Sequence, residues 1–280
     1  MTIEDIIRKA LEEDLGPGDH TSLATIPAEA QGSSRLLIKE PGVLSGVDIA
    51  RLVFKTLDPG LDIEIFIPDG TPVRKGDIAF IVKGSIRSIL AGERLALNFM
   101  QRMSGIATAT REMANQLSGT KAKLLDTRKT TPLLRELEKM AVRHGGGENH
   151  RMGLFDMIMI KDNHVDFAGG IREAIQAAES YLRLRHEDLK IEIEVRNFQE
   201  LEQVLQAGMV DRIMLDNFSP ADMARAVQMI GGRYETEASG GINLSNIRQY
   251  AQTGIDFISV GSLTHHINSL DMSLKAVTHS

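Results

Sequence analysis

The chain has 280 residues, of which 42% are hydrophobic and 4% aromatic, and it carries a formal net charge of −6. This hydrophobic share suffices for a sizeable core and argues against intrinsic disorder, and the acidic balance is untypical of a protein that coats nucleic acid. Cysteine is absent, which excludes disulfides, thiolate zinc sites and thiol nucleophiles.

The N-terminal segment predicts an acidic, amphipathic helix at about residues 3–14. This segment lacks the basic start and the apolar run of a secretory signal peptide. No stretch of the chain approaches the ~20 apolar residues that are needed to cross a bilayer. We therefore expect a soluble, cytoplasmic protein that has neither a membrane nor a nucleic acid as a partner.

The segments up to about residue 117 mix turns, strands and helices. The turn-rich segment GPGDHTS precedes the strand-like stretches RLLIKEPGVLSG and LDIEIFIPDGTPVRKGDIAFIVKG, which Pro-Gly, Asp-Gly and Lys-Gly-Asp turns divide. Between these two stretches, VDIARLVFKTL has helical spacing. A helix-rich stretch then runs from about Ser85 to Leu117, and an interruption is predicted around Ser104-Gly105.

After about residue 120 the chain repeats a unit of short apolar run, loop and helix. The apolar runs are AKLLDT, DMIMIKD, KIEIEV, DRIMLD, YETEAS and DFISV, and helical segments separate most of them. This alternation predicts βα units with a buried parallel sheet. Six strands, or seven with one weak run, are too few for a full eight-stranded barrel, so an incomplete barrel and an open sheet are both alternatives.

A polar group follows each of the six runs. These groups are Asp126-Thr127-Arg128-Lys129, Lys161-Asp162-Asn163-His164, Glu194, Asp216-Asn217, Ser239-Gly240-Gly241 and Gly261-Ser262. Ligands of α/β barrels and open α/β sheets bind at the carboxyl ends of the strands. Because most strand–helix loops need only turn residues, these six groups together predict a binding site at that edge of the sheet.

Glycine turns after the last two runs indicate a phosphate site. The Ser239-Gly240-Gly241 and Gly261-Ser262 turns would let backbone N–H groups approach a phosphate closely, at the position that is usual in such barrels. The alternative is that these glycines serve tight turns only. The pattern predicts a phosphorylated ligand without identifying it, and no dinucleotide or Walker motif accompanies it.

Positive side chains gather at or near the same strand ends. They are Arg128, Lys129, His150, Arg151 and Lys161. Arginine can bind a carboxylate or phosphate through two parallel hydrogen bonds, and lysine acts as a point charge. Lys161 follows a very apolar run, so it must emerge into a cavity or find a partner. The set indicates a ligand with several negative charges, and the alternative is a network of structural ion pairs with the acids that follow the same runs.

Glu194 and Asp216 each end a buried run, and they are our candidates for contacts with a ribose and with Mg²⁺ that is held partly by substrate phosphates. Glu192 lies two residues before Glu194 on the same face of the predicted strand, so periodicity does not separate these two acids.

Arg94 lies in the predicted helix SILAGERLALNFMQRM, on one stripe with Leu90, Leu97 and Gln101. Between two leucines, Arg94 is expected to be more buried than its neighbours. It could pair with an acid such as Glu93, or it could project into the site of a neighbouring subunit.

Together these segments resemble the quinolinate phosphoribosyltransferases over almost the whole chain. The matching segments are, in order, EEDLGPGDHTS, KEPGVLSGVDIA, GERLALNFMQRMSGIAT, DTRKTTPLLRELEKMAVRHGGGENHRMGL, MIMIKDNH, EIEV, IMLDNFSP, EASGGINL and SVGSLTH. The stretch from Asp126 to His164 is long and highly specific. The resemblance implies an N-terminal α/β sandwich domain at 1–115 and a C-terminal α/β barrel with fewer than eight strands at 116–265. It also implies that a tail at about 266–280 packs back on the first domain.

The resemblance further implies roles for individual residues. Arg94 is implied to be lent across a homodimer, which is sometimes assembled further, to the quinolinate of the partner subunit. The implied lining of the quinolinate and pyrophosphate sites is Thr127, Arg128, Lys129, His150, Arg151 and Lys161. Glu194 and Asp216 are implied to face the ribose and its Mg²⁺. The implied 5′-phosphate loops contain Ser239, Gly240, Gly241, Val260, Gly261 and Ser262. Lys129, Lys161, Glu194 and Asp216 are the members of this set that we expect to be catalytic.

The implied activity converts quinolinate and phosphoribosyl pyrophosphate to nicotinate mononucleotide, CO₂ and pyrophosphate in NAD biosynthesis. Positioning and electrostatics are expected to do most of the work, without a protein nucleophile. Mg²⁺ bound with phosphoribosyl pyrophosphate is the expected cofactor, and no organic cofactor is expected. Two alternatives stay open: a paralogous phosphoribosyltransferase-like protein with another ligand, and a non-catalytic phosphate-binding barrel.

Overall fold

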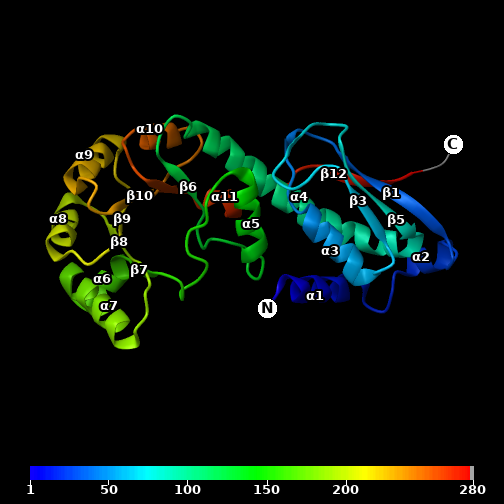
Figure 1. Cartoon of the computed structure of the whole chain (residues 1–280), viewed down its shortest axis with the longest axis horizontal. Helices are drawn as coiled ribbons and strands as arrows, with labels where there is room; N and C mark the ends of the chain where they lie inside the picture. The colour runs from blue at the N-terminus through cyan, green and yellow to red at the C-terminus, as the bar shows by residue number, and fades with distance from the viewer. Residues whose placement is uncertain (278–280) are drawn as a thin grey trace. The chain divides into compact units, whose positions relative to one another are not determined.

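The computed structural model describes residues 1–277, which divide into two compact units (Figure 1). Unit 1 consists of Met1–Arg111, Thr130–Gly146 and the described residues from Leu263 onward. Unit 2 consists of Glu112–Lys129 and Gly147–Ser262. The domains expected from the sequence meet at a single boundary between residues 115 and 116. The observed division differs, because the chain passes between the units more than once.

Unit 1 is built around a four-stranded antiparallel sheet with the strand order β12-β1-β5-β3. Its strands are β1 (Gln31–Ile38), β3 (Asp62–Ile65), β5 (Ile78–Ser85) and β12 (Met272–Ala276), and a separate two-stranded sheet pairs β2 (Gly42–Val43) with β4 (Pro72–Val73). The tail thus supplies an edge strand to the N-terminal sheet through β12. Residues 278–280 of the expected tail lie outside the described residues.

The core of unit 1 lies between this sheet and its helices. The Phe54 ring of α3 (Val47–Leu57) meets the Phe80 ring of β5 edge-on, with 6.2 Å between the ring centroids. Both rings are fully buried, and α1 (Ile3–Leu15) packs against α3. The predicted α/β sandwich is therefore confirmed for unit 1.

Side-chain caps begin the first two helices. The Thr2 hydroxyl accepts a hydrogen bond from the Asp5 N–H at 3.2 Å, and the Asp5 carboxylate accepts one from the Thr2 N–H at 3.0 Å, which starts α1. The segment GPGDHTS, expected to be turns, instead enters α2 (His20–Thr25). It does so because the Asp19 carboxylate caps that helix by accepting the Ser22 N–H at 3.1 Å.

α4 (Ile86–Gln116) runs without interruption through Ser104 and Gly105, so the predicted break is wrong. The Ser104 hydroxyl donates to the Ser45 carbonyl at 3.0 Å, and a Cβ atom at Gly105 would collide with the Asn268 carbonyl. These small residues therefore allow other segments of unit 1 to pack closely on α4 without breaking it. No helix in residues 1–277, α4 included, combines the length and the apolar character that crossing a membrane requires.

α5 (Arg135–Gly145) belongs to unit 1 because it packs tightly on α4. A Cβ atom at Gly145 would lie 2.5 Å from the Ala107 carbonyl oxygen, so only glycine fits this crossing. The Arg102 guanidinium also contacts the buried Glu138 carboxylate at 2.6 Å. These contacts tie the helix to unit 1, although residues of unit 2 flank it in the sequence.

Unit 2 is a six-stranded, wholly parallel sheet with the strand order β6-β11-β10-β9-β8-β7. The strands are β6 (Lys123–Leu125), β7 (Ile158–Ile160), β8 (Ile191–Val195), β9 (Arg212–Asp216), β10 (Glu235–Ser239) and β11 (Phe257–Ser259). Its helices are α6 (Asp162–Ala168), α7 (Ile171–Arg185), α8 (Phe198–Ala207), α9 (Pro220–Ile230) and α10 (Ile247–Ala251), and α11 (Ser262–His265) begins at its last residue. Figure 1 shows the helices of unit 2 on the outer side of the curved sheet. β6 and β7 end the strand order and do not pair with each other within the described residues, which confirms an incomplete barrel.

The two faces of this sheet differ in character. In β8, Ile191, Ile193 and Val195 alternate with Glu192 and Glu194. The register places Glu192 beside Arg212 of β9, and Arg212 beside Glu235 of β10. Because successive side chains of a strand point to opposite faces, one face is apolar and the other carries charged groups such as Glu192, Arg212 and Glu235.

Replacing Gly105 with alanine should destabilise the protein by about 1–3 kcal/mol, because the added methyl group would overlap backbone rather than the end of a flexible side chain. The higher helix propensity of alanine would offset about 1 kcal/mol of this cost. Urea unfolding followed by circular dichroism measures the difference, with Asn98→Ala at an exposed position of α4 as the control. A Gly105→Ala protein as stable as its parent would contradict the close approach of Asn268.

Candidate functional site

A cavity of about 340 Å³ lies in unit 2 at the carboxyl ends of the strands. Its lining is Thr127, Arg128, Lys129, His150, Arg151, Met159, Lys161, Met214, Glu237, Ser239 and Ser259. Seven of these were predicted from the sequence, namely Thr127, Arg128, Lys129, His150, Arg151, Lys161 and Ser239. The structure therefore brings the predicted cations of separate segments together in one cavity.

The first cationic segment directly follows β6. The Lys129 N–H donates to the Thr127 hydroxyl at 3.1 Å, which closes a tight turn at the end of the strand. Arg128 between them is half-buried and Lys129 is exposed. The turn thus presents both positive side chains at the mouth of the cavity.

The second cationic segment lies beside β6. The Glu148 N–H donates to the Leu124 carbonyl at 2.8 Å, and the Asp126 N–H donates to the Glu148 carbonyl at 3.2 Å. The fully buried Asp126 carboxylate accepts hydrogen bonds from the His150 N–H at 2.8 Å and from the Asn149 side chain at 2.6 Å. These bonds place His150 and Arg151 next to the turn that follows β6.

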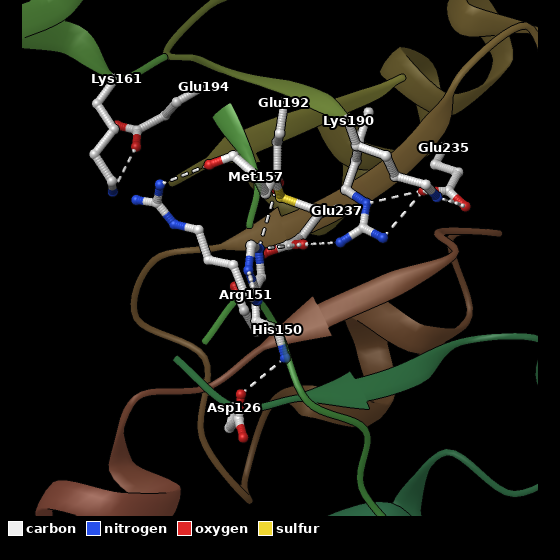
Figure 2. A network of polar contacts seen from close by, with 12 residues as sticks. Asp126, His150, Arg151, Met157, Lys161, Lys190, Glu192, Glu194, Glu235 and Glu237 are labelled. Carbon is white, nitrogen blue, oxygen red and sulfur yellow. Dashed lines mark hydrogen bonds and ion pairs between the residues drawn. The ribbon is translucent and has the colours of Figure 1, made fainter. Parts of the chain in front are cut away.

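His150 lies inside the barrel and points away from solvent. Its Nε2 atom is 3.0 Å from Glu192 and 3.3 Å from Glu237, and both acids are fully buried (Figure 2). Burial opposes a positive imidazole, but Glu192 and Glu237 outweigh it and raise the pKa of His150 to about 9. The Arg151 N–H donates to His150 Nδ1 at 2.7 Å, which opposes a proton on that nitrogen.

His150, Glu192 and Glu237 form one buried cluster of titratable groups. Burial, together with the charge of Glu237, raises the pKa of Glu192 to about 7. Nδ1 accepts a hydrogen bond, so Nε2 is the ring atom that faces the two carboxylates. The opposite charge of His150 lowers the pKa of Glu237, although burial alone would raise it.

Arg151 and Arg128 are neighbours of like charge. Burial and the proximity of Arg128 lower the pKa of Arg151. The Arg151 guanidinium donates to the Met157 carbonyl at 3.2 Å, which anchors it at the cavity (Figure 2). An anion that binds at both guanidinium groups would relieve their mutual repulsion.

Lys161 follows β7 and keeps its ammonium group partly in solvent. Its Nζ atom donates to Glu194 at 3.2 Å, and the Lys161 and Glu194 side chains are 45% and 12% exposed. The His164 ring accepts the Lys161 backbone N–H at 2.9 Å, at the start of α6. Lys161 thus lies at the edge of the cavity with one acidic partner, as expected for a lysine that emerges from an apolar strand.

The two glutamates of β8 have different surroundings, a difference that the periodicity of the sequence could not predict. Glu192 is fully buried and contacts His150, whereas Glu194 is half-buried and contacts Lys161 near the strand end. Asp216 ends β9, the neighbouring strand, and its carboxylate accepts the Asn217 side-chain amide at 2.6 Å. Glu194 and Asp216 are not among the residues that line the cavity; they lie at the carboxyl-end halves of the neighbouring strands β8 and β9.

The glycine turn after β10 has a backbone that few other residues could adopt. Gly240 has φ +94°, and a Cβ atom there would collide with the Asn217 side chain. Asn217 itself has φ 57° and donates its N–H to the Ser239 carbonyl at 2.9 Å. Gly241, with φ +65°, has open space beside it. This turn brings backbone close to the space above the strand ends.

The turn after β11 is more constrained than expected. Val260 is buried, and its N–H donates to the Leu125 carbonyl of β6 at 3.0 Å. This N–H is therefore occupied by the sheet, and Gly261 and Ser262 are the members of the turn that lie beyond the strand.

Arg94 lies on α4 in unit 1, and its predicted burial is wrong. The residue is exposed, and Leu90 on the same stripe is 40% exposed. The buried face of α4 is formed instead by residues such as Leu95, Ala96 and Phe99. Leu90 is not a core residue, so it does not mark the core-facing side of the helix.

Four lining residues were not predicted: Met159, Met214, Glu237 and Ser259. All four lie within strands and face the interior, rather than following the strand ends. A signal for Glu237 was present in YETEAS, where charged residues alternate inside a run that should be apolar on both faces, whereas nothing in the runs singled out Met159, Met214 or Ser259.

Two family models together cover most of the chain. The model described as quinolinate phosphoribosyl transferase, C-terminal domain, matches residues 106–275. The model described as quinolinate phosphoribosyl transferase, N-terminal domain, matches residues 19–104.

Individual proteins match over nearly the full length. The quinolinate phosphoribosyltransferase (decarboxylating) 2b, mitochondrial, of Nicotiana tabacum is 43% identical over 291 residues, which cover 99% of this chain and 82% of that protein. The nicotinate-nucleotide pyrophosphorylase (carboxylating), chloroplastic, of Arabidopsis thaliana is 44% identical over 291 residues, which cover 99% of this chain and 83% of that protein. The crystal structure of NadC from Streptococcus pyogenes is similar with a TM-score of 0.93 and 40% identity, covering 99% of this chain and 97% of that one.

These names contradict the expectation of a cytoplasmic protein. The relatives from Nicotiana tabacum and Arabidopsis thaliana are named mitochondrial and chloroplastic. An acidic chain without cysteine is equally compatible with the interior of an organelle, so composition did not determine the compartment.

Both domain models, the full-length relatives and the shared fold agree on one family. The chain belongs to the quinolinate phosphoribosyltransferase family.

Proposed function

We propose that the cavity of unit 2 is the active site in which this quinolinate phosphoribosyltransferase converts quinolinate and phosphoribosyl pyrophosphate to nicotinate mononucleotide, CO₂ and pyrophosphate for NAD biosynthesis. The observation that carries the assignment is the convergence of Arg128, Lys129, Arg151 and Lys161 on one cavity. Both substrates are multiply anionic, and a group of cations with few acids among them favours such ligands.

Arg128 and Arg151 are the proposed binding groups for the two carboxylates of quinolinate. Their guanidinium groups are close enough for Arg128 to lower the pKa of Arg151, and burial adds to this effect. Arginine binds a carboxylate through two parallel hydrogen bonds, which fixes the orientation of the planar ring as well as its position. With both carboxylates held, the ring nitrogen would be aimed at the ribose.

Lys129 and Lys161 are proposed to stabilise the charge that develops on the leaving pyrophosphate. In the reaction the pyridine nitrogen forms a bond to the anomeric carbon while the bond from that carbon to pyrophosphate breaks, and positive charge gathers on the ribose. Fixed ammonium groups at the departing oxygens lower the energy of this transition state. Both lysines reach the cavity, from segments that follow β6 and β7, which suits two contacts with one pyrophosphate.

Decarboxylation follows from the charge on the new pyridinium nitrogen. The bond between the ring and the adjacent carboxylate breaks, CO₂ leaves, and the electron pair stays on the ring carbon next to the positive nitrogen until a proton replaces it. No protein nucleophile is required for either step.

The turns after β10 and β11 are proposed to bind the 5′-phosphate. Ser239 lines the cavity, and Gly240 and Gly241 follow it with positive φ angles that let the backbone approach a ligand. Gly261 and Ser262 form the second turn. They follow Val260, whose N–H donates a hydrogen bond to β6. Phosphate binding after the last strands is usual in α/β barrels.

Glu194 and Asp216 fit a magnesium ion that the substrate itself helps to hold. They end neighbouring strands and offer carboxylate oxygens, the ligand type that Mg²⁺ prefers. Within residues 1–277 they are not part of any group of three potential protein ligands, which suits an ion that takes its other ligands from substrate phosphates and water. When bound, Mg²⁺ would neutralise charge on the pyrophosphate. The same acids are proposed to accept hydrogen bonds from the ribose hydroxyls.

We also propose a homodimer in which Arg94 completes the site of the partner subunit. Arg94 and Leu90 are exposed on α4, although the helix buries its other face. An exposed arginine beside an exposed leucine is a suitable interface pair, because arginine is enriched and lysine depleted at interfaces.

Replacing Lys161 with alanine should lower kcat by about 100-fold or more, since a fixed cation at the leaving group would be lost. The fold should survive, because Lys161 is 45% exposed and has one ion-pair contact, with Glu194. Turnover of quinolinate and thermal unfolding measure the two effects. Lys121→Ala, which breaks an exposed pair with Asp256, is the matched control. Near-normal turnover of Lys161→Ala would remove this residue from the site.

Chelation of divalent ions should abolish turnover, and added Mg²⁺ should restore it. Asp216→Asn should raise the Mg²⁺ concentration that gives half-maximal activity by about tenfold, because one charged oxygen ligand is lost. Asp188→Asn, at an exposed position before β8, is the control and should leave the Mg²⁺ dependence unchanged. Full activity in a chelator would rule out the proposed ion.

The shared site can be tested by mixing two inactive proteins, Arg94→Ala and Lys161→Ala. In a mixed dimer, one site would combine the intact Lys161 of one subunit with the intact Arg94 of the other. Random pairing after co-expression should therefore recover about one quarter of parental activity. If Arg94 acts within its own subunit, the mixture should stay inactive.

A further inference from the structure

A chain of ion pairs crosses the interior of unit 2 below the cavity, and the roles assigned above do not use it. From one end to the other it consists of Lys190, Glu235, Arg212, Glu237, His150 and Glu192 (Figure 2). The Arg212 guanidinium lies 3.0 Å from both Glu235 and Glu237 and stacks over the Phe257 ring at 4.0 Å. Buried ion pairs often contribute little net stability, so such a chain calls for another explanation.

Both ring nitrogens of His150 are engaged by the protein. Nε2 faces Glu192 and Glu237, and Nδ1 accepts the Arg151 N–H at 2.7 Å. The backbone N–H of His150 is bound by Asp126 at 2.8 Å, and the imidazole is only 4% exposed. Although His150 lines the cavity, the atoms that could bind an anion point into the barrel or toward Arg151.

Arg151 is held from two sides as a result. Its backbone N–H is bound to the His150 ring, and its guanidinium is bound to the Met157 carbonyl. A guanidinium that repels its neighbour Arg128 would otherwise move away from the cavity. The orientation of the imidazole thus fixes the position of the Arg151 backbone, and with it the point from which the Arg151 side chain extends into the cavity.

We propose that Glu192 and Glu237 are positioning residues for quinolinate binding: they orient the His150 ring from inside the barrel, and His150 in turn holds Arg151 in place for a carboxylate of the substrate. Arg212 holds Glu237 in position from the other side, at 3.0 Å. This inference rests on the proposed assignment of the cavity as the quinolinate site.

The same three residues could be read as a metal site, because one atom from each of His150, Glu192 and Glu237 lies within 4.8 Å of the others. Arg212 argues against this reading. Its Nη1 atom already contacts the Glu237 oxygen that faces His150, and a divalent cation there would lie close to a guanidinium. A histidine that receives the Arg151 N–H on Nδ1 can still orient Arg151 without any ion.

The test asks whether removing the charge of Glu237 strengthens or weakens quinolinate binding. Glu237 is an acid at the wall of an anion-binding cavity, so its removal would strengthen quinolinate binding if charge alone mattered. A positioning role predicts the reverse. We expect Glu237→Gln to raise the Kd and the KM of quinolinate about tenfold, because the negative charge that pairs with His150 and Arg212 is lost even though an amide oxygen remains. The KM of phosphoribosyl pyrophosphate should change less than about twofold.

Glu235→Gln is the matched control. It removes an acid from the same chain of ion pairs, with contacts to Lys190 and Arg212 but none to His150 among the described residues. Its quinolinate Kd should stay within about twofold of the parent value. Calorimetric titration with quinolinate and thermal unfolding would be measured on the full-length protein for every variant.

A second pair of variants keeps the inference testable if Glu237→Gln does not fold. Glu192→Ala removes a contact of Nε2 and should weaken quinolinate binding about tenfold, whereas Glu192→Gln keeps an oxygen at the same place and should restore it to within about twofold. Equal or tighter binding by both Glu237→Gln and Glu192→Ala would overturn the inference. Absence of quinolinate binding or turnover in the parent protein would instead overturn the proposed function, so the two failures are distinguishable.

Discussion

The pairing of residues 147–150 with β6 is the constraint on which the cavity depends. The barrel is open between β6 and β7, and the extended segment lies beside β6 through backbone bonds to Leu124 and Asp126. Arg128 and Arg151 are separated in the sequence by α5. Without this pairing, no backbone contact would hold their two segments side by side. The Asp126 carboxylate secures the arrangement by binding both His150 and Asn149.

Charge is layered along the interior of unit 2. Acids and their partners Arg212 and His150 fill the barrel, whereas the cations at the strand ends face the cavity. β10 shows the gradient in a single strand, from Glu235 through the fully buried Glu237 to Ser239 at the cavity. The inner layer thus pairs its acids with Arg212 and His150, and the outer cations line the cavity, where they favour anionic ligands.

Much of the fold followed from periodicity, and the exceptions have local causes. Apolar runs separated by amphipathic helices predicted the six parallel strands, because buried parallel strands and one-sided helices have distinct patterns. The break predicted at Ser104-Gly105 failed because those residues accommodate Asn268, a partner some 160 positions away in the chain. α2 was read as a turn because its capping residue, Asp19, lies in a segment rich in glycine. The burial expected for Arg94 failed because Leu90, one of the two leucines on its stripe, lies outside the core.

The sequence by itself determined the family, the two kinds of sheet, and the cations that line the cavity, because these depend on residue type and on spacing along the chain. Only the tertiary structure decided that Glu192 faces His150 while Glu194 faces Lys161, and that Glu237 joins the lining of the cavity. Alternation assigns all three acids to the same face, but their neighbours come from strands and loops that are distant in sequence. The physical reason is that a contact across a barrel depends on strand order and register, which no local pattern encodes.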